Sequence, residues 1–366
     1  MIPKLPFALV PRQSQSRVPL IAVPAATIAL TLISAILMFS ALGASPGVVL
    51  YAFFVEPLSS TYNLGEVLIK ASPLILIAQG LAIGFRAKVW NIGAEGQLIV
   101  GAICASLIPI YWSRSDSLLL LPGMIVLGAL GGVAWAAIAA MLRTRFNASE
   151  IITTLMLTEI ARQLLYFLVT GPLRDPMGYN FPQSVRFPLA ALYPTFGGVG
   201  VRANLSIIIT LVVTVVCWIF VTKSFASFKL LVGGTSPAAA KYAGFLPKQA
   251  IWISLLVGGL VAGLAGVGEI AGPIGKLQRI ISPGYGYAAI IVAFLGGLSP
   301  TGIVFAGLFM AVIYVGGDNA LVTAEIPASA PVVFQGLLLV FYLATSGFAR
   351  YEIRRLPSAV SVARVA

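Results

Sequence analysis

Long apolar stretches, separated by short groups of charged residues, prolines and glycines, run along almost the whole chain. A helix that crosses the hydrocarbon core of a bilayer needs about 20 apolar residues. By this criterion the pattern predicts about ten spanning helices. They cover 20–42, 65–84, 93–111, 118–142, 150–170, 204–222, 251–271, 284–298, 301–316 and 332–348. The eighth stretch is short and bounded by glycines, which leaves a half-helix or a re-entrant segment open.

The composition excludes a water-soluble globule. Of the 366 residues, 59% are hydrophobic and only 9% are charged, whereas about 25% are charged in ordinary soluble domains. A core cannot hide so much apolar surface, so the main solvent of this chain is lipid. The predicted fold class is therefore an all-α integral membrane protein.

The excess of basic residues predicts the topology. Lys and Arg number 23 against 11 Asp and Glu, and cytoplasmic loops hold most of the Lys and Arg of a membrane protein. With the N-terminus inside, fifteen of the 23 lie on the cytoplasmic side, and Lys70 and Arg162 fall within spans. The outer side then holds Arg114, Arg174, Arg186, Arg202, Lys276 and Arg279. We therefore expect an even number of spans, with both termini cytoplasmic.

This topology divides the chain into a cytoplasmic tail over 1–19, a membrane domain over 20–348 and a second cytoplasmic tail over 349–366. Two connections are long. The outer segment 171–203 is rich in prolines and aromatic residues, and we expect it to form a structured cap. The inner segment 223–250 is the other, and loops of this length usually have a function. We interpret it as a docking element.

Several kinds of chemistry have no residues to support them. The chain has no His, which removes the commonest proton relay and zinc ligand. Cys104 and Cys217 both fall in apolar runs, which indicates free buried thiols. The nearest approach to a phosphate-binding loop, Gly272–Lys276, is too short and is followed by Leu277. We expect no catalytic residues, no metal site and no enzyme activity in this chain.

The string Trp90–Gln97 places an acid, two amides and two glycines at the start of the third span. In a structural interpretation Asn91 caps the helix, Glu95 is stabilised by the positive helix N-terminus, and Gly93 and Gly96, with Gly101 further on, let a neighbour approach. In a functional interpretation Glu95 and Gln97 line a water-filled path, because ionisable groups in spans are costly. Both interpretations stay open.

The fifth span carries further charged residues. Asn147 and Glu150 have the spacing of a capping box, which predicts a structural role for Glu150. Glu159 and Arg162 are three apart and share a helix face. They form a neutral bridge or border a solute route together with Gln163 and Tyr166.

The segment Gly234–Gly244 within the inner connection has the signals of a short helix. Thr235 or Ser236 can cap it, Pro237 fits its first turn, Lys241 suits its last turn and Gly244 can stop it. A free helix of two turns is not stable. It therefore docks against a partner or lies on the membrane as an amphipathic connector.

Small residues and a second acidic group complete the pattern. The runs Gly128–Ala140 and Gly258–Gly272 predict tight helix packing, for example through Gly259 and Gly263. Asp318, Asn319 and Glu325 are assigned to solvent in the outer loop between the last two spans.

The run NIGAEGQLIVGA over 91–102 is very similar to the signature of permease subunits of bacterial ATP-binding cassette (ABC) importers. It resembles the nucleoside-type branch of the branched-chain amino acid/simple sugar permease superfamily, which works with lipoprotein receptors of the basic-membrane-protein type. Glu150–Leu157, Gly234–Gly244 and Ala289–Gly297 extend the resemblance over about 65–345. Two positions depart from the branch: Thr158 and Glu159 follow Met-Leu where an Asn is usual, and Gly284–Tyr287 lacks an acid.

The resemblance implies a type II importer-like permease of the bacterial inner membrane, forming half of a pore that works by alternating access. Residues of the signature and the fifth span would border the path: Asn91, Gly93, Glu95, Gly96, Gln97, Glu159 and Arg162. The segment Gly234–Gly244 would be the helix that couples to the ATPase, through Thr235, Ser236, Pro237, Ala240, Lys241 and Gly244.

The implied partners are an ABC ATPase that uses ATP and Mg, a second, smaller permease that completes a heterodimer, and a lipoprotein or periplasmic receptor. No cofactor is expected in this chain and no nucleic acid partner. If the receptor docks on the outer loops, Arg174, Arg186 and Arg202 could pair with its acidic residues.

The implied cargo is a nucleoside, with a simple sugar or another small solute as the alternative. A proton- or ion-coupled carrier that uses Glu95 and Glu159 is a competing hypothesis. A membrane-embedded enzyme is a third, for which no polar triad or dyad is found.

Overall fold

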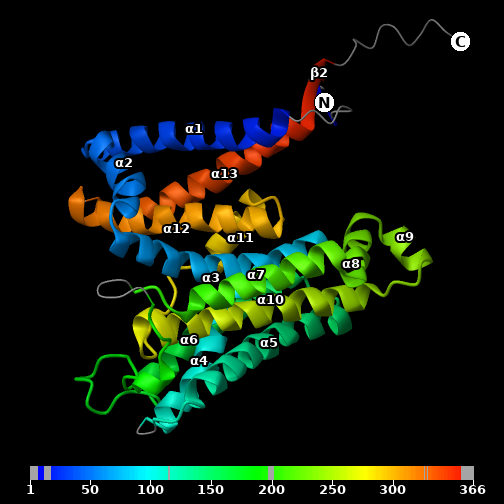
Figure 1. Ribbon diagram of the computed structural model, residues 1–366. Coiled ribbons are helices and arrows are strands. Elements are labelled where there is room, and N and C mark those ends of the chain that lie inside the picture. Colours follow the sequence, from blue (N-terminus) through cyan, green and yellow to red (C-terminus); the bar gives the residue numbers. More distant parts are fainter. Residues whose placement is uncertain are drawn as a thin grey trace, which may run out of the picture. The chain divides into compact units, whose positions relative to one another are not determined.

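The computed structural model describes residues 7–11, 18–113, 116–196, 202–324, 326–327 and 329–355. The described chain is almost entirely helical (Figure 1). The long helices are α1 (Val18–Ala41), α3 (Thr61–Arg86), α4 (Ala94–Tyr111), α5 (Leu120–Phe146), α6 (Glu150–Thr170), α7 (Leu205–Lys223), α10 (Pro247–Glu269), α12 (Pro300–Thr323) and α13 (Ala330–Arg350). The shorter helices are α2 (Pro46–Phe54), η1 (Glu56–Leu58), η2 (Leu189–Ala191), α8 (Phe225–Thr235), α9 (Pro237–Tyr242), η3 (Ile270–Ile274) and α11 (Tyr285–Leu295).

Every predicted span coincides with a helix, and among the described residues 8 helices are long and apolar enough to cross a membrane. The eighth predicted span is α11, which has only 11 residues. At 1.5 Å per residue it extends about 16 Å, half of the hydrocarbon thickness. The length of α11 is that of a half-helix, one of the two alternatives predicted for this stretch.

Four features of the helices were not predicted. The inner connection contains α8 as well as α9, and α2 precedes the second span. The helix α10 ends in a π-helical turn, η3, which contains Pro273. The helix α12 continues to Thr323, so the assignment of Asp318 and Asn319 to an outer loop is wrong. Asp318 instead forms an ion pair with Lys70, whose Nζ lies 2.6 Å from Asp318 Oδ2. Glu325 and Arg114 lie outside the described residues.

The helices separate into two compact units, residues 51–319 and residues 1–50 with 320–366. In the larger unit α10 packs against α3, α4 and α5 through glycines. A side chain at Gly132 would overlap the carbonyl of Gly259, and one at Gly101 would lie 2.5 Å from Cα of Gly263. The prediction of tight packing through small residues is confirmed.

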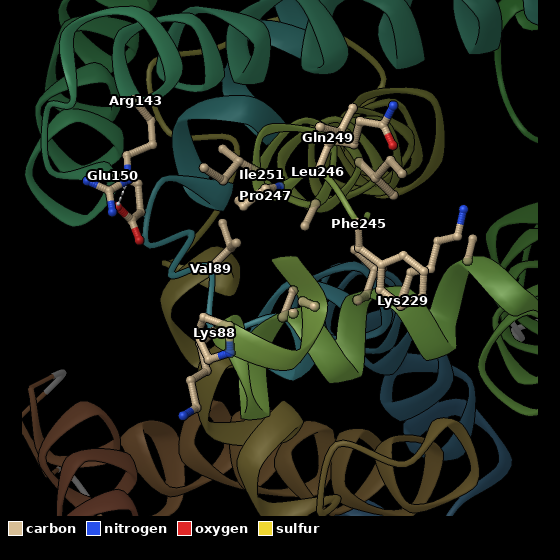
Figure 2. A pocket seen from close by; sticks show the side chains of 18 of the residues that line it. Lys88, Val89, Arg143, Glu150, Lys229, Phe245, Leu246, Pro247, Gln249 and Ile251 are labelled. Carbon is tan, nitrogen blue, oxygen red and sulfur yellow. Dashed lines mark ion pairs between the residues drawn. The ribbon is translucent and has the colours of Figure 1, made fainter. Parts of the chain in front are cut away.

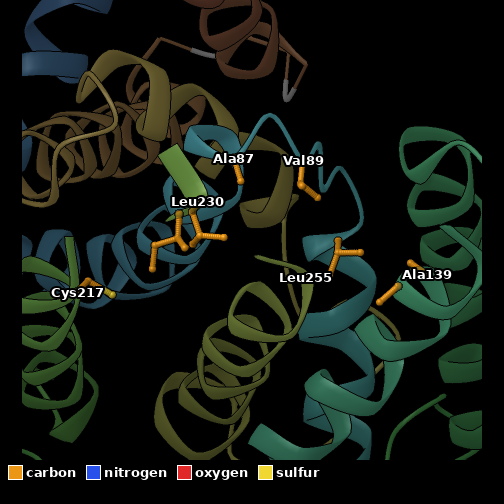
Figure 3. Packing of buried hydrophobic residues seen from close by; sticks show 8 residues of the cluster. Ala87, Val89, Ala139, Cys217, Leu230 and Leu255 are labelled. Carbon is orange, nitrogen blue, oxygen red and sulfur yellow. The ribbon is translucent and has the colours of Figure 1, made fainter. Parts of the chain in front are cut away.

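A cluster of buried apolar residues joins five helices at the end of the larger unit where α8 lies (Figure 3). Leu230 of α8 and Cys217 of α7 contribute to it, with Leu255 of α10 and Ala139 of α5. Cys217 is a free, buried thiol and Cys104 is free and half-buried. The cluster attaches α8 to the neighbouring ends of α3, α5, α7 and α10.

In the smaller unit α1 packs against α13, and Thr27 Oγ1 lies 2.8 Å from Thr345 Oγ1 between them. Strands β1 (Phe7–Pro11) and β2 (Tyr351–Arg355) then pair antiparallel, Phe7 opposite Arg355. This strand pair within the predicted tails was not expected. It brings residues 7–11 beside residues 351–355.

Candidate functional site

The signature string folds into a tight turn that opens α4. Asn91 Oδ1 accepts the N–H of Gly93 at 3.0 Å, close to the predicted cap, although Gly93 is the residue that flanks the helix. Asn91 and Gln97 also exchange two hydrogen bonds, at 3.0 and 3.2 Å, and both are buried. Gln97 is therefore hydrogen-bonded to Asn91 and does not line an open path.

Glu95 lies where two helices begin. It is in the first turn of α4, its side chain is only 2% exposed, and its Oε2 accepts the N–H of Gly286 in the first turn of α11 at 2.7 Å. A Cβ at Gly286 would lie 2.6 Å from Cα of Glu95. Two helix N-termini thus stabilise one carboxylate.

The glycines of the string let α6 approach α4. A Cβ at Gly93 would lie 2.5 Å from the carbonyl oxygen of Thr154, and one at Gly96 would lie 2.7 Å from Cα of Thr158. The Thr154 hydroxyl accepts the N–H of Ile92 at 3.2 Å. This contact places Glu95 beside the polar face of α6.

A groove of about 770 Å³ lies between α4, α6 and the segment that precedes α11. Glu95, Arg162, Gln163 and Tyr166 line it, together with Ile99, Leu165, Arg279, Ile280, Ile281, Ser282, Pro283, Gly284 and Tyr287. Of the predicted path residues, the structure brings Glu95 and Arg162 to this groove. Asn91, Gly93, Gly96, Gln97 and Glu159 support its walls instead.

Arginines and tyrosines are paired along the groove. Arg162 donates to Glu159 Oε1 at 2.9 Å, as the spacing predicted, and its guanidinium lies 5.5 Å from the ring centre of Tyr287. The guanidinium of Arg279 lies 4.9 Å from the ring centre of Tyr166. The groove therefore presents planar cationic and aromatic groups. Sequence reasoning missed Arg279 and Tyr287, because only the fold brings the segment before α11 to α6.

The predicted capping box at the start of α6 is wrong. Asn147 has a left-handed backbone, φ 52°, and ends α5, while Ser149 is the residue that precedes α6. Asn tolerates this conformation better than most residues, which suits the end of a helix. Glu150 instead forms an ion pair with Arg143 Nε at 3.0 Å.

The segment Gly234–Gly244 contains the predicted short helix, α9. Ser236 precedes it, Pro237 is its first residue, and Gly244 ends it with φ +75°. The hydroxyl of Thr235 donates to the Leu231 carbonyl within α8 at 2.8 Å, so Thr235 does not cap α9. Ala240 is 3% exposed, whereas Lys241 is exposed and Tyr242 is 97% exposed. Tyr242 was missed as a candidate, although an aromatic residue in a short connecting helix is a signal for a contact surface.

A second cavity, of about 460 Å³, lies beside α8 and α9, and we call it the basic cavity (Figure 2). Lys229 lies over the rings of Phe225 and Phe245, at 4.9 and 5.5 Å. The charged and polar residues that line the basic cavity are Lys88, Arg143, Glu150, Lys229 and Gln249. Its apolar lining includes Ala87, Val89, Phe225, Leu230, Pro237, Ala240, Phe245, Leu246, Pro247, Ala250, Ile251 and Ile253.

The outer segment is structured over its described residues, as expected. Ser184 donates its N–H to the Leu277 carbonyl at 2.8 Å, and Lys276 Nζ donates to Gln183 Oε1 at 2.6 Å. Burial raises the pKa of the Tyr193 phenol. Arg202 forms an ion pair with Glu66 at 3.2 Å, so one of the three proposed receptor contacts is engaged within the chain.

Comparison with known proteins gives a consistent result. A family model described as branched-chain amino acid transport system / permease component matches residues 63–343. A glucose ABC transporter permease protein of Haloferax volcanii is 36% identical over 309 residues, 82% of this chain and 81% of the relative. A guanosine ABC transporter permease protein of Bacillus subtilis is 29% identical over 300 residues, 81% and 84% of the two chains. A nucleoside ABC transporter permease protein of Lactococcus lactis is 30% identical over 276 residues, 73% and 75%.

Proposed function

We propose that the cargo of this chain, which belongs to the permease-component family of branched-chain amino acid transport systems, is a nucleoside. The chain is a multi-pass inner-membrane subunit of an ABC importer. Permeases of this family work with an ATPase and a substrate-binding protein. The proposal concerns the solute, the path it takes and the contacts with those partners.

The observation that carries the proposal is the pairing of planar groups along the groove. Arg162 with Tyr287 and Arg279 with Tyr166 offer two cation–aromatic platforms, and nucleobases stack on aromatic rings and on guanidinium planes. The volume, about 770 Å³, is in the range of ordinary small-molecule sites. Relatives named for guanosine and for nucleosides support the same cargo.

In this proposal the residues of the signature have two roles. Glu95 and Arg162 border the path and supply its polar contacts, with Glu159 holding Arg162 in place. Asn91 and Gln97 keep the opening turn of α4 rigid, and Gly93 and Gly96 hold α6 against it. The path is complete only when the second permease covers the groove.

Coupling to the ATPase would occur through α9. Lys241 and Tyr242 are exposed, while Ala240 is buried against the chain and Pro237 lines the basic cavity. Ser236 and Gly244 fix the start and end of the helix, and Thr235 links it to α8. ATP and Mg are bound by the ATPase, whose closure would move α9 and switch the groove from outward to inward access. The second permease would be a related chain, and the receptor a lipoprotein.

The test is uptake into vesicles by the reconstituted complex. We expect ATP-dependent uptake of labelled guanosine or adenosine. Replacement of Tyr166 by Ala should raise the KM about tenfold, because one base–aromatic stack contributes about 1–3 kcal/mol. The matched control is Phe167→Ala, which removes an exposed ring from the next position of α6 outside the groove.

A simple sugar is the alternative cargo, which the glucose permease of Haloferax volcanii favours. Uptake of labelled glucose without nucleoside uptake would support it and refute the nucleoside proposal. Uptake that continues without ATP and stops with a protonophore would instead indicate an ion-coupled carrier.

A further inference from the structure

The helix α8 has apolar residues on two faces. Ser227, Leu230 and Gly234 are buried against the rest of the chain. On the other side Phe225, Phe228 and Leu231 are 63%, 53% and 43% exposed, and their spacing of three residues places them along one stripe. The rings of Phe225 and Phe228 stack, with centres 6.0 Å apart. Apolar residues on two faces of a helix need an apolar surrounding on both, and the one charged residue of α8 is Lys229.

The stripe leads into the basic cavity, because Phe225 belongs to both. The helix α8 follows the span α7 after a single residue, Ser224, which caps it through the N–H of Ala226 at 3.1 Å. The helix therefore begins at the membrane boundary. An amphipathic segment at this level buries its apolar face at the boundary of headgroups and acyl chains.

The cavity has unmatched positive charge. Its one acid, Glu150, is paired with Arg143. Among the ion pairs of the described residues, none involves Lys88 or Lys229. Lys88 is held by a strained backbone, φ 55°, and Lys229 by the rings of Phe225 and Phe245. In Figure 2 the Arg143–Glu150 pair and Lys229 lie on opposite sides of the cavity.

We propose that the basic cavity binds an anionic phospholipid of the inner leaflet. Its headgroup lies at the cavity, to which Lys88 and Lys229 supply positive charge from separate sides, and its acyl chains extend along Phe225, Phe228 and Leu231. Basic pockets between helices on the cytoplasmic side are suited to anionic headgroups. The lipid would lie behind α9, whose Lys241 and Tyr242 point the other way, and so it would support the coupling helix without competing with the ATPase. The proposal rests on the proposed function only in placing this face at the inner leaflet.

The experiment is native mass spectrometry of the complex, purified with its partners and titrated with phosphatidylglycerol or phosphatidylcholine. We expect phosphatidylglycerol to be retained preferentially. Replacing both Lys88 and Lys229 by Ala should weaken this retention about 30-fold, about fivefold for each lysine. Arg at both positions should preserve it and shows that the fold is intact.

The matched control is the pair Lys223→Ala and Lys248→Ala. These lysines lie at the inner ends of α7 and α10 and do not line the cavity. Their replacement removes the same charge as replacement of Lys88 and Lys229. Equal loss in the control pair, or unchanged retention when Lys88 and Lys229 are replaced, would overturn the proposal. Loss of the ATPase from the Lys88 and Lys229 variant, with lipid retention unchanged, would identify the cavity as an ATPase contact and also overturn it. None of these readouts depends on which solute is transported.

Discussion

The groove and the basic cavity are both lined by charged side chains, but the partners of those side chains differ between the two regions. In the groove Glu95 accepts a backbone N–H, Arg162 pairs with Glu159, and Arg162 and Arg279 lie over tyrosines. In the basic cavity Lys88 and Lys229 have no ion pair among the described residues. Arg279 and Lys229 both lie over aromatic rings, so the difference lies in the acids: Glu95 and Glu159 accompany the arginines of the groove, whereas the one acid of the basic cavity is paired with Arg143. The first arrangement suits a path that a neutral solute must leave again, and the second suits an anionic ligand that stays.

The contacts that form the walls of the two regions also differ. Gly93, Gly96 and Gly286 bring backbones into direct contact around the groove. Beside the basic cavity, side chains such as Leu230 hold α8 in place, and one glycine, Gly234, makes a comparable backbone contact, with the Arg86 carbonyl. Backbone contacts admit no added atom, while side-chain contacts can adjust. The groove should therefore be the more sensitive of the two to small substitutions.

The largest expected effect comes from Gly286→Ala. The new Cβ would overlap the backbone of Glu95 and separate α11 from α4, and overpacking of this kind costs about 1–3 kcal/mol. We expect loss of transport and a fall in the Tm of the purified complex, measured by a thermal-shift assay. The control is Gly336→Ala in α13, where a Cβ meets nothing within 4 Å; a similar fall there would refute the explanation.

A smaller effect is expected for Tyr242→Ala on α9. An exposed aromatic residue is the usual centre of a protein contact, and its truncation costs about 2 kcal/mol in such a position. We expect about 30-fold weaker binding of the ATPase, measured by titration of the reconstituted complex. Tyr62→Ala removes an exposed ring from the first turn of α3 and should leave this binding unchanged. Unaltered ATPase affinity in Tyr242→Ala would exclude α9 as the contact.

The smallest effect is expected for Glu159→Gln. The ion pair with Arg162 is half-exposed at i,i+3, a geometry that contributes about 0.2–0.5 kcal/mol to helix stability. The Tm should hardly change. The KM for the solute should rise two- to threefold, because Arg162 loses its fixed position over Tyr287. A large fall in Tm without any change in KM would assign the pair to stability alone.

Local signals predicted much of this fold. Apolar length located the 8 helices that are long and apolar enough to cross a membrane, and Pro237 with Gly244 located α9 within the inner connection. The weakest local prediction was the start of α6. Asn147 can cap a helix or end one in the left-handed conformation, and the length of α5, which runs to Phe146, decides between the two.

Long-range pairs set the limit for the rest. Lys70 and Asp318 are 248 residues apart, and so no local pattern reveals that they meet. The same holds for Glu95 with Gly286 and for Arg279 with Tyr166, which define the groove. Hydropathy also does not distinguish neighbours from lipid: the apolar window of α3 is 89% buried in protein and that of α7 only 17%.

The pairing of β1 with β2 places two segments from opposite parts of the sequence side by side, so that the backbone is close to forming a ring. Phe7 lies opposite Arg355 in this strand pair, so a short linker from residue 355 to residue 7 could close the backbone without moving either strand. New ends could then be opened in a long connection on either side of the membrane, since chains with adjacent termini often tolerate circular permutation. The order of helices along the polypeptide would change, while the parity of crossings would not.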